Sequence, residues 1–311
     1  MGGTAMTARE AAEPLARGVW GVVATPFRGE DLAVDAESLA RLVRRYEEVG
    51  ATGLTVLGVF GEASALTAAE RAVVLSVAVA HTALPLVVGV TSLATGPAID
   101  EIEAARRVTG ERMVAAMVQV NSPRPDAVVR HLHDVHAATG VPIVLQDYPV
   151  ASGVAISTDD LLRVVGACPF LSAVKAEAPP TAMAIARIAA ATPASVFGGL
   201  GGQSLLDELA AGSAGAMTGF SVPEALVACV SAWLSGDEDG ARRTFTPYLP
   251  LVNFEQQPRI ALALRKDLFT RRGLFAEGSV RPPAAPFPAQ LAPLAVGHLA
   301  RAEALLSGGE A

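Results

Sequence analysis

The chain has 311 residues, of which 51% are hydrophobic, and this is enough material for one large core. Its formal net charge is -7 at pH 7, and the sequence contains no cluster of lysine and arginine. These features argue against a nucleic-acid partner, because a phosphate-binding surface needs clustered positive charge. Residues 1–16 are small and polar and lack the apolar segment of a signal peptide, so we expect a flexible tail on a cytoplasmic protein.

Two further features concern the cellular setting. Cys168 and Cys229 lie in apolar stretches without Cys-x-x-Cys spacing, which indicates two reduced, buried thiols. The most apolar stretch, residues 72–94, is divided by His81 and Pro85 into a helix followed by a strand. We therefore expect no membrane span and no membrane partner.

Short apolar runs rich in valine, isoleucine and leucine alternate with longer amphipathic segments along most of the chain. This alternation is typical of parallel strands covered by helices. The predicted strands are residues 19–24, 53–58, 86–90, 113–120, 143–147, 171–175, 195–199 and 215–218. Eight such strand-and-helix units close most naturally into a (β/α)8 TIM barrel.

The predicted helices have recognisable starts. Asp35 precedes a helix at 36–49, and Thr67 with Glu70 forms a capping box for a helix at 68–80. After the eighth strand, helices are predicted at 223–234, 239–251, 259–271 and 289–306, with an ordered proline-rich loop at 281–288. Because this is more helix than a barrel needs, we assign 17–222 to the barrel and 223–311 to a C-terminal helical extension packed on it.

Lysine is rare in this chain, and its two positions differ in context. Lys266 lies in the helical run Arg265-Lys266-Asp267, where we expect a solvated cation. Lys175 ends the strand Leu171-Ser172-Ala173-Val174-Lys175, and the C-terminal ends of barrel strands are where active groups occur. A buried ammonium is costly unless it is neutralised or paired. Lys175 is therefore the first candidate for a functional residue.

A lysine in a dry site can lose its charge, and the neutral amine attacks a carbonyl carbon to form an imine. The protonated imine withdraws electrons from the neighbouring carbon, which supports retro-aldol cleavage, aldol addition or loss of a β-hydroxyl as water. The alternative is a structural lysine that pairs with Glu177 or Asp147. The position alone leaves both interpretations open.

Two glycine-rich loops follow strands. Gly58-Val59-Phe60-Gly61-Glu62 comes after the second strand, where backbone N–H groups could converge on a carboxylate, although an ordinary tight loop would read the same way. Gly198-Gly199-Leu200-Gly201-Gly202 follows the seventh strand, and Gly199 is a candidate for substrate binding. Neither loop has the lysine and serine or threonine of a P-loop, so we expect no nucleotide cofactor.

Polar residues also close the fifth strand, in Gln146-Asp147-Tyr148-Pro149. Gln146 and Tyr148 should share a face because strand side chains alternate, and Tyr148 could either relay protons or pack as an ordinary aromatic residue. The three histidines His131, His133 and His136 have no metal-ligand spacing, so we expect surface helix residues and no metal.

Taken in order, these motifs resemble the dihydrodipicolinate synthase and N-acetylneuraminate lyase family of Schiff-base barrels. The resemblance covers Gly18 to about Leu306. Its markers are Ala24-Thr25-Pro26-Phe27, the loop from Gly58 to Glu62 in place of Gly-Thr-Thr-Gly-Glu, and Lys175 in place of the imine-forming lysine. It implies a lyase that acts on a 2-oxo acid and assembles as a homo-oligomer, a dimer or a tetramer.

The chain departs from the synthases of that family at each side chain of their proton relay. Gln146 stands where the tyrosine acid and base is expected, and Val59 and Phe60 replace the paired threonines. The second tyrosine falls at Gln119 or Val120, and the arginine that receives the second substrate's carboxylate falls at Ala151. A dihydrodipicolinate synthase is therefore not expected.

A narrower likeness comes from Gln146-Asp147, the Phe60 loop, Gly215-Ala216-Met217-Thr218-Gly219 and Leu249-Pro250-Leu251-Val252-Asn253. These resemble the 2-keto-3-deoxy-arabonate dehydratase branch, whose members remove water from a keto-deoxy sugar acid through the lysine imine. The loop also looks like that of hydratase-aldolases acting on aromatic pyruvate derivatives. The alternatives are thus a pyruvate-dependent aldolase or hydratase-aldolase, and a barrel without catalysis that binds a small acid.

The working hypothesis places the substrate carboxylate on the N–H groups of Val59 and Phe60, beside Gly61, while Lys175 condenses with the adjacent carbonyl. Tyr148 is the first candidate for the acid and base. Glu177 and Gln146 are expected to orient substrate or water. Gln146 is not expected to act as acid or base, because an amide cannot exchange protons usefully near neutral pH.

Overall fold

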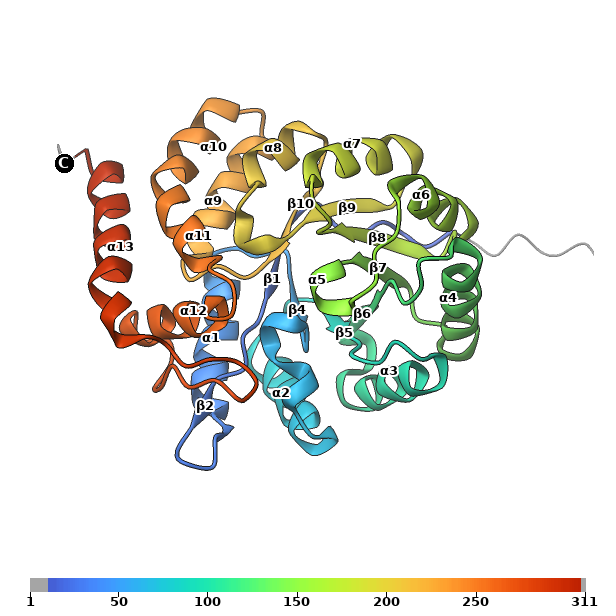
Figure 1. Cartoon of the computed structure of the whole chain (residues 1–311), viewed down its shortest axis with the longest axis horizontal. Helices are drawn as coiled ribbons and strands as arrows, with labels where there is room; N and C mark the ends of the chain where they lie inside the picture. Colours follow the sequence, from blue (N-terminus) through green and yellow to red (C-terminus); the bar gives the residue numbers. More distant parts are fainter. Residues whose placement is uncertain (1–10, 309–311) are drawn as a thin grey trace, which may run out of the picture.

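The protein, described here by a computed structural model of residues 11–308, is built around a closed barrel of eight parallel strands (Figure 1). The order around the barrel is β1-β10-β9-β8-β7-β6-β5-β4. The strands are β1 (Gly18–Val22), β4 (Gly53–Val56), β5 (Leu86–Gly89), β6 (Met113–Gln119), β7 (Ile143–Asp147), β8 (Leu171–Ala176), β9 (Ser195–Gly198) and β10 (Gly215–Thr218). All eight predicted strands and the TIM-barrel class are confirmed.

Helices cover the outside of the barrel. They are α1 (Ala36–Glu48), α2 (Ala68–His81), α3 (Thr95–Thr109), α4 (Pro125–Thr139), α6 (Thr158–Ala167), α7 (Thr181–Ala191), α8 (Leu205–Ala210) and α9 (Pro223–Leu234). The two predicted N-terminal caps are present, because Asp35 accepts from Ser38 N and Thr67 with Glu70 forms the full capping box. A short hairpin of β2 (Phe27–Arg28) and β3 (Ala33–Val34), and the one-turn helix α5 (Pro149–Ser152), were not predicted.

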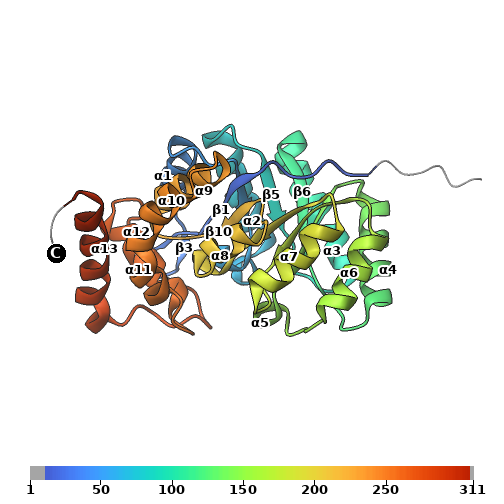
Figure 2. The same ribbon diagram turned by 90° about the horizontal axis from the view of Figure 1, so that it is seen from above.

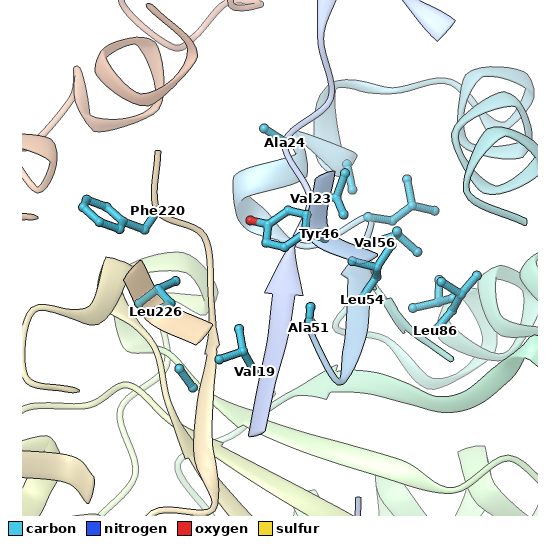
Figure 3. Packing of buried hydrophobic residues seen from close by; sticks show 14 of the residues in the cluster. Val19, Val23, Ala24, Tyr46, Ala51, Leu54, Val56, Leu86, Phe220 and Leu226 are labelled. Atoms are coloured by element: carbon cyan, nitrogen blue, oxygen red, sulfur yellow. The ribbon is translucent and has the colours of Figure 1, made fainter. Parts of the chain in front are cut away.

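Alternation along the strands divides the core into two clusters. Inward side chains such as Trp20, Met117 and Phe197 fill the barrel interior. Outward side chains pack against the helices, as Figure 3 shows for Tyr46 of α1 beside Leu54 of β4. A strand residue therefore faces either the barrel interior or the helices, and this decides which residues can reach the site.

The N-terminal and C-terminal segments lie against this barrel. The expected tail falls mostly on residues 1–10, outside the described residues; beyond them, Ala12 N donates to Pro169 O and Leu15 N to Ser172 O. α9 packs on β1, and the extension continues through α10 (Glu238–Phe245), α11 (Leu249–Glu255), α12 (Ala261–Arg271) and α13 (Ala292–Leu306). Figure 2 shows α11 and α12 between the barrel and α13.

Three sequence predictions are wrong in detail. The single helix at 239–251 is broken at the 3-10 turn Thr246–Tyr248, because Pro247 and Pro250 lack the N–H group that a continuous helix needs. His131 is buried, with Nδ1 2.9 Å from the Thr95 hydroxyl, rather than on the surface. Apart from these corrections, no helix within residues 11–308 is long and apolar enough to cross a membrane.

The third correction concerns Lys266, which is fully buried instead of solvated. Its ammonium pairs with the carboxylate of Glu62, donates to Ser279 O at 2.9 Å and lies 4.2 Å from the Phe27 ring centroid. Arg281 N donates to the second oxygen of Glu62 at 3.0 Å. The C-terminal extension thus holds the end of the loop that follows β4.

That loop needs such support because of its backbone. Leu57 and Glu62 flank it with φ values of 57° and 52°, in the left-handed region that side chains disfavour. The hydroxyl of Thr25 holds its middle by donating to Gly61 O at 2.7 Å. Residues from the segment after β1, from α12 and from the proline-rich loop therefore fix the conformation of residues 58–62.

We predict that Lys266→Met lowers the free energy of unfolding by about 3–5 kcal/mol, because Glu62 would remain buried without its partner. The matched control is Arg271→Met on the same helix, which breaks the more exposed pair with Asp267 and should cost less than about 1 kcal/mol. Urea unfolding of both variants measures the difference. Equal losses would contradict the role of the buried pair.

Candidate active site

A cavity of about 210 Å³ opens at the C-terminal end of the barrel. Its walls come from strand ends, from the loops after β4 and β9, and from the C-terminal extension. The lining residues are Val22, Val59, Phe60, Gln146, Tyr148, Lys175, Glu177, Leu200, Gly201, Thr218, Gly219, Gln256, Ala261, Leu262 and Arg265. This is the end of a TIM barrel at which active sites form.

Lys175 reaches the cavity because it faces the barrel interior. In β8, Ala173 packs in the interior cluster, and the next inward position is Lys175. The register pairs Lys175 with Gln146 of β7, and Gln146 with Gln119 of β6. The layer above the apolar barrel interior is therefore polar, and Lys175 lies in it with 5% of its surface exposed.

Glu177 is the carboxylate that contacts this lysine. Its Oε2 lies 3.2 Å from Lys175 Nζ and accepts from Gln146 Nε2 at 2.7 Å, while Oε1 accepts from Leu200 N at 3.2 Å. The carboxylate lies so close to Gly199 that a Cβ atom there would overlap it. Lys175 therefore has the ion pair with Glu177 that a purely structural role would require, but the pair borders an open cavity instead of being sealed in the core.

Burial and the charge of Glu177 raise the pKa of two further buried carboxyl groups, those of Asp147 and Glu208. Burial, reinforced by the charge of Glu177, raises the pKa of Asp147 to about 6. Burial raises the pKa of Glu208 to about 7, against the lowering effect of the hydrogen bond from the Thr181 hydroxyl, and the charge of Glu177 adds to the increase. Near neutral pH Glu208 is therefore partly protonated, whereas Asp147 is mostly ionised.

The loop after β4 offers backbone donors. Val59 and Phe60 are the first residues of the 3-10 turn Val59–Gly61, and their N–H groups have no hydrogen-bond partner among residues 11–308. Gly61 N instead donates to Gly58 O at 3.0 Å. The N–H groups of Val59 and Phe60 are thus available for the predicted anion binding, whereas the N–H group of Gly61 is not.

Tyr148 and Gln146 both line the cavity, as the alternation predicted. Burial and the charge of Glu177 raise the pKa of Tyr148, so its hydroxyl stays protonated near neutral pH. A protonated phenol can donate a proton, but it must lose its own before it can accept one.

Six of the eight predicted site residues line the cavity, whereas Gly61 and Gly199 do not. Gly61 anchors the loop through its carbonyl, and Gly199 leaves room for Glu177. Sequence reasoning missed Thr218, which ends β10, and Gln256 and Arg265, which come from the extension. The position of Thr218 at a strand end was a usable signal, whereas the contacts of Arg265 depend on how α12 packs.

The sequence model of the Dihydrodipicolinate synthetase family matches residues 15–296, nearly the whole chain. The chain belongs to this family. It is therefore a lyase.

Individual relatives span more than one activity within the family. The chain is 30% identical to an L-2-keto-3-deoxyarabonate dehydratase of Azospirillum brasilense, with 86% of each chain covered. It is 29% identical to 4-hydroxy-tetrahydrodipicolinate synthase 1 of Streptomyces coelicolor, covering 79% of this chain and 81% of that one. The crystal structure of a dihydrodipicolinate synthase from Rhodopseudomonas palustris is similar with a TM-score of 0.84 and 28% identity, covering 94% and 100% of the two chains.

The raised pKa of Glu208 predicts a pH dependence of stability in this family member. The folded state holds the proton more tightly than the unfolded state, so stability from this group is present below about pH 4.5 and is lost as the pH rises towards 7. At about 1.4 kcal/mol for each pKa unit, the loss is on the order of 3 kcal/mol.

Glu208→Gln cannot ionise and should therefore become more stable relative to the unsubstituted protein between pH 5 and pH 8. Urea unfolding at several pH values measures this change. Asp207→Asn is the matched control, because Asp207 is the exposed neighbour on the same helix. A constant difference across the pH range for Glu208→Gln would contradict the assignment.

Proposed function

We propose that this lyase forms an imine between Lys175 and a 2-oxo acid and dehydrates a 2-keto-3-deoxy sugar acid. The observation that carries the proposal is the contact of 3.2 Å between Lys175 Nζ and Glu177 Oε2 on the wall of an open cavity. Of the residues that line this cavity, Glu177 alone has a carboxylate. An amine and a proton acceptor are thus adjacent where a small acid can enter.

The first step is formation of the imine. The 2-oxo acid carboxylate rests on the free N–H groups of Val59 and Phe60, and a proton passes from Lys175 Nζ to Glu177. The neutral amine adds to the C2 carbonyl, and the oxygen leaves as water. The protonated imine then draws electrons from C3 and makes its hydrogen acidic.

The second step is elimination. In the imine, C3 is two bonds from the nitrogen, and Glu177 lies beside Nζ. After Glu177 has passed the proton that it took from Lys175 to the departing C2 oxygen, its carboxylate is placed to remove the C3 proton. The electrons of the C3–H bond form the C3–C4 double bond, and the C4 hydroxyl leaves as water with a proton from Tyr148. Glu177 as base and Tyr148 as acid is a change from the sequence hypothesis, in which Tyr148 served both roles.

We choose dehydration over synthesis because, within residues 11–308, the barrel mouth has no cation near Ala151. A neighbouring cavity of about 220 Å³ shares Val59 and Gln146 with the first and is bordered by Ala151, where the synthases have their arginine. None of its lining residues carries a positive charge. A second, carboxylate-bearing substrate would find no cation there, whereas a dehydratase needs only one substrate. The similarity to the Azospirillum brasilense enzyme supports the same choice.

Borohydride reduction in the presence of pyruvate or a 2-keto-3-deoxy sugar acid should attach the acid covalently to Lys175. Peptide mass spectrometry locates the label, and buried Lys266 serves as an internal control because the chain has only these two lysines. Lys175→Met should abolish labelling and turnover. Absence of label across a panel of 2-oxo acids, or label on Lys266 alone, would refute the imine. Release of pyruvate and an aldehyde instead of a semialdehyde would identify an aldolase.

The roles of Glu177 and Tyr148 can be separated with pyruvate in deuterated water. Exchange of the C3 protons requires the imine and a base but no departing hydroxyl. Glu177→Gln should slow exchange by about 10²–10⁴-fold, whereas Tyr148→Phe should keep exchange and lose dehydration by a similar factor. NMR follows exchange, and a product assay follows dehydration. Loss of exchange in Tyr148→Phe, with exchange retained in Glu177→Gln, would return the base to Tyr148.

A further inference from the structure

Arg265 is a buried cation on the wall of the active-site cavity that the proposed reaction does not use. It lies on α12 with 8% of its surface exposed, and its guanidinium carbon is 5.1 Å from the Phe60 ring centroid. Nε is 3.2 Å from Glu255 Oε2. Nη2 is buried and has no hydrogen-bond partner among residues 11–308. An unpaired buried donor on a charged group is costly unless a ligand satisfies it.

The neighbouring backbone is shaped around this group. Gly201 adopts a left-handed φ of 66°, and a Cβ atom there would lie 2.5 Å from Arg265 Nη2 and overlap the side-chain nitrogen of Gln256. Gly201 N donates to the Thr218 hydroxyl at 2.7 Å, and Gln256 Nε2 donates to Leu200 O at 2.6 Å. The turn after β9 thus leaves room for Arg265 and Gln256 at the cavity.

We propose that Arg265 binds a hydroxyl group on the tail of the substrate, the part beyond C4, and thereby selects sugar acids over 2-oxo acids with an apolar tail. This rests on the proposed function and names its substrate class more closely. Lys175 and the loop after β4 account for the ketone and the carboxylate, so the wall formed by α12 is left for the rest of the molecule.

The chemistry of that wall favours hydroxyl groups. Arg265 is a donor, the Thr218 hydroxyl can both donate and accept, and the Gln256 side-chain oxygen can accept. A hydroxylated tail has donors and acceptors to match all three groups, whereas a second carboxylate only accepts. Glu255 already accepts from Nε, so a second carboxylate cannot bind side by side along the Nε edge of Arg265. An aromatic tail would leave Nη2 unsatisfied.

The test compares how variants capture pyruvate, which has no tail, with how they capture a hydroxylated 2-keto-3-deoxy acid and its analogue without the terminal hydroxyl. The readout is the acid concentration that gives half-maximal borohydride labelling of Lys175, so it does not depend on dehydration. The variants are Arg265→Met and the double change Arg265→Met with Glu255→Gln, which leaves no unpaired buried carboxylate. Arg271→Met is the matched control, because it removes a more exposed arginine from the same helix.

The protein should capture the hydroxylated acid about 10- to 150-fold better than the deoxy analogue, the range expected for a hydrogen bond to a charged group. Both Arg265 variants should lose this preference and keep pyruvate capture within about threefold of normal, while Arg271→Met keeps both.

Several results would overturn the inference. Loss of pyruvate capture in the double variant would mean that Arg265 binds the substrate's C1 carboxylate or is needed for folding. A preference that survives both substitutions would mean that Arg265 does not contact the tail. If the Arg265 variants lost more capture of a 2-oxo diacid than of the hydroxylated acid, Arg265 would bind a second carboxylate instead of a hydroxyl group. Failure of the unsubstituted protein to capture any 2-oxo acid would instead refute the imine proposal itself.

Discussion

The buried ion pair between Lys266 and Glu62 joins the C-terminal extension to the loop on which the active site depends. Its geometry matters because a buried pair offsets its desolvation cost only when both charges are well placed. Lys266 follows Arg265 in α12, and successive helix residues point about 100° apart. One helix therefore places a lysine on the loop and an arginine on the cavity, so the extension and the barrel mouth are fixed relative to each other.

Inside the barrel, the site begins where the apolar layers end. Gln119, Gln146 and Lys175 share one level through the register of β6, β7 and β8. Glu177 lies two residues beyond Lys175, where its charge is balanced by the ammonium and by hydrogen bonds from Gln146 and Leu200. A charged pair is tolerated at this depth because both oxygens of the Glu177 carboxylate have partners.

The sequence was most informative where local patterns decide the structure. Short apolar runs, the amphipathic segments between them and the caps at Asp35 and Thr67 were sufficient to predict all eight strands and the first helices. They led to Lys175, Gln146 and Tyr148 because strand ends are definable from sequence. Lys266 and Arg265 could not be predicted in the same way, because a charged residue in an amphipathic helix reads as solvated until the surfaces packed against it are known.

The proposed reaction and the missing side chains of the synthases fit one physical argument. A synthase must hold the carboxylate of a second molecule, and Ala151 removes the cation for that purpose from the mouth of the barrel. Arg265 supplies a cation from another direction, through α12 and against Gly201. Under the proposed function, the shift of positive charge from the loop after β7 to the extension lets the cavity recognise the tail of a single substrate in place of a second substrate. In the proposed function, the imine chemistry then leads to loss of water instead of formation of a carbon–carbon bond.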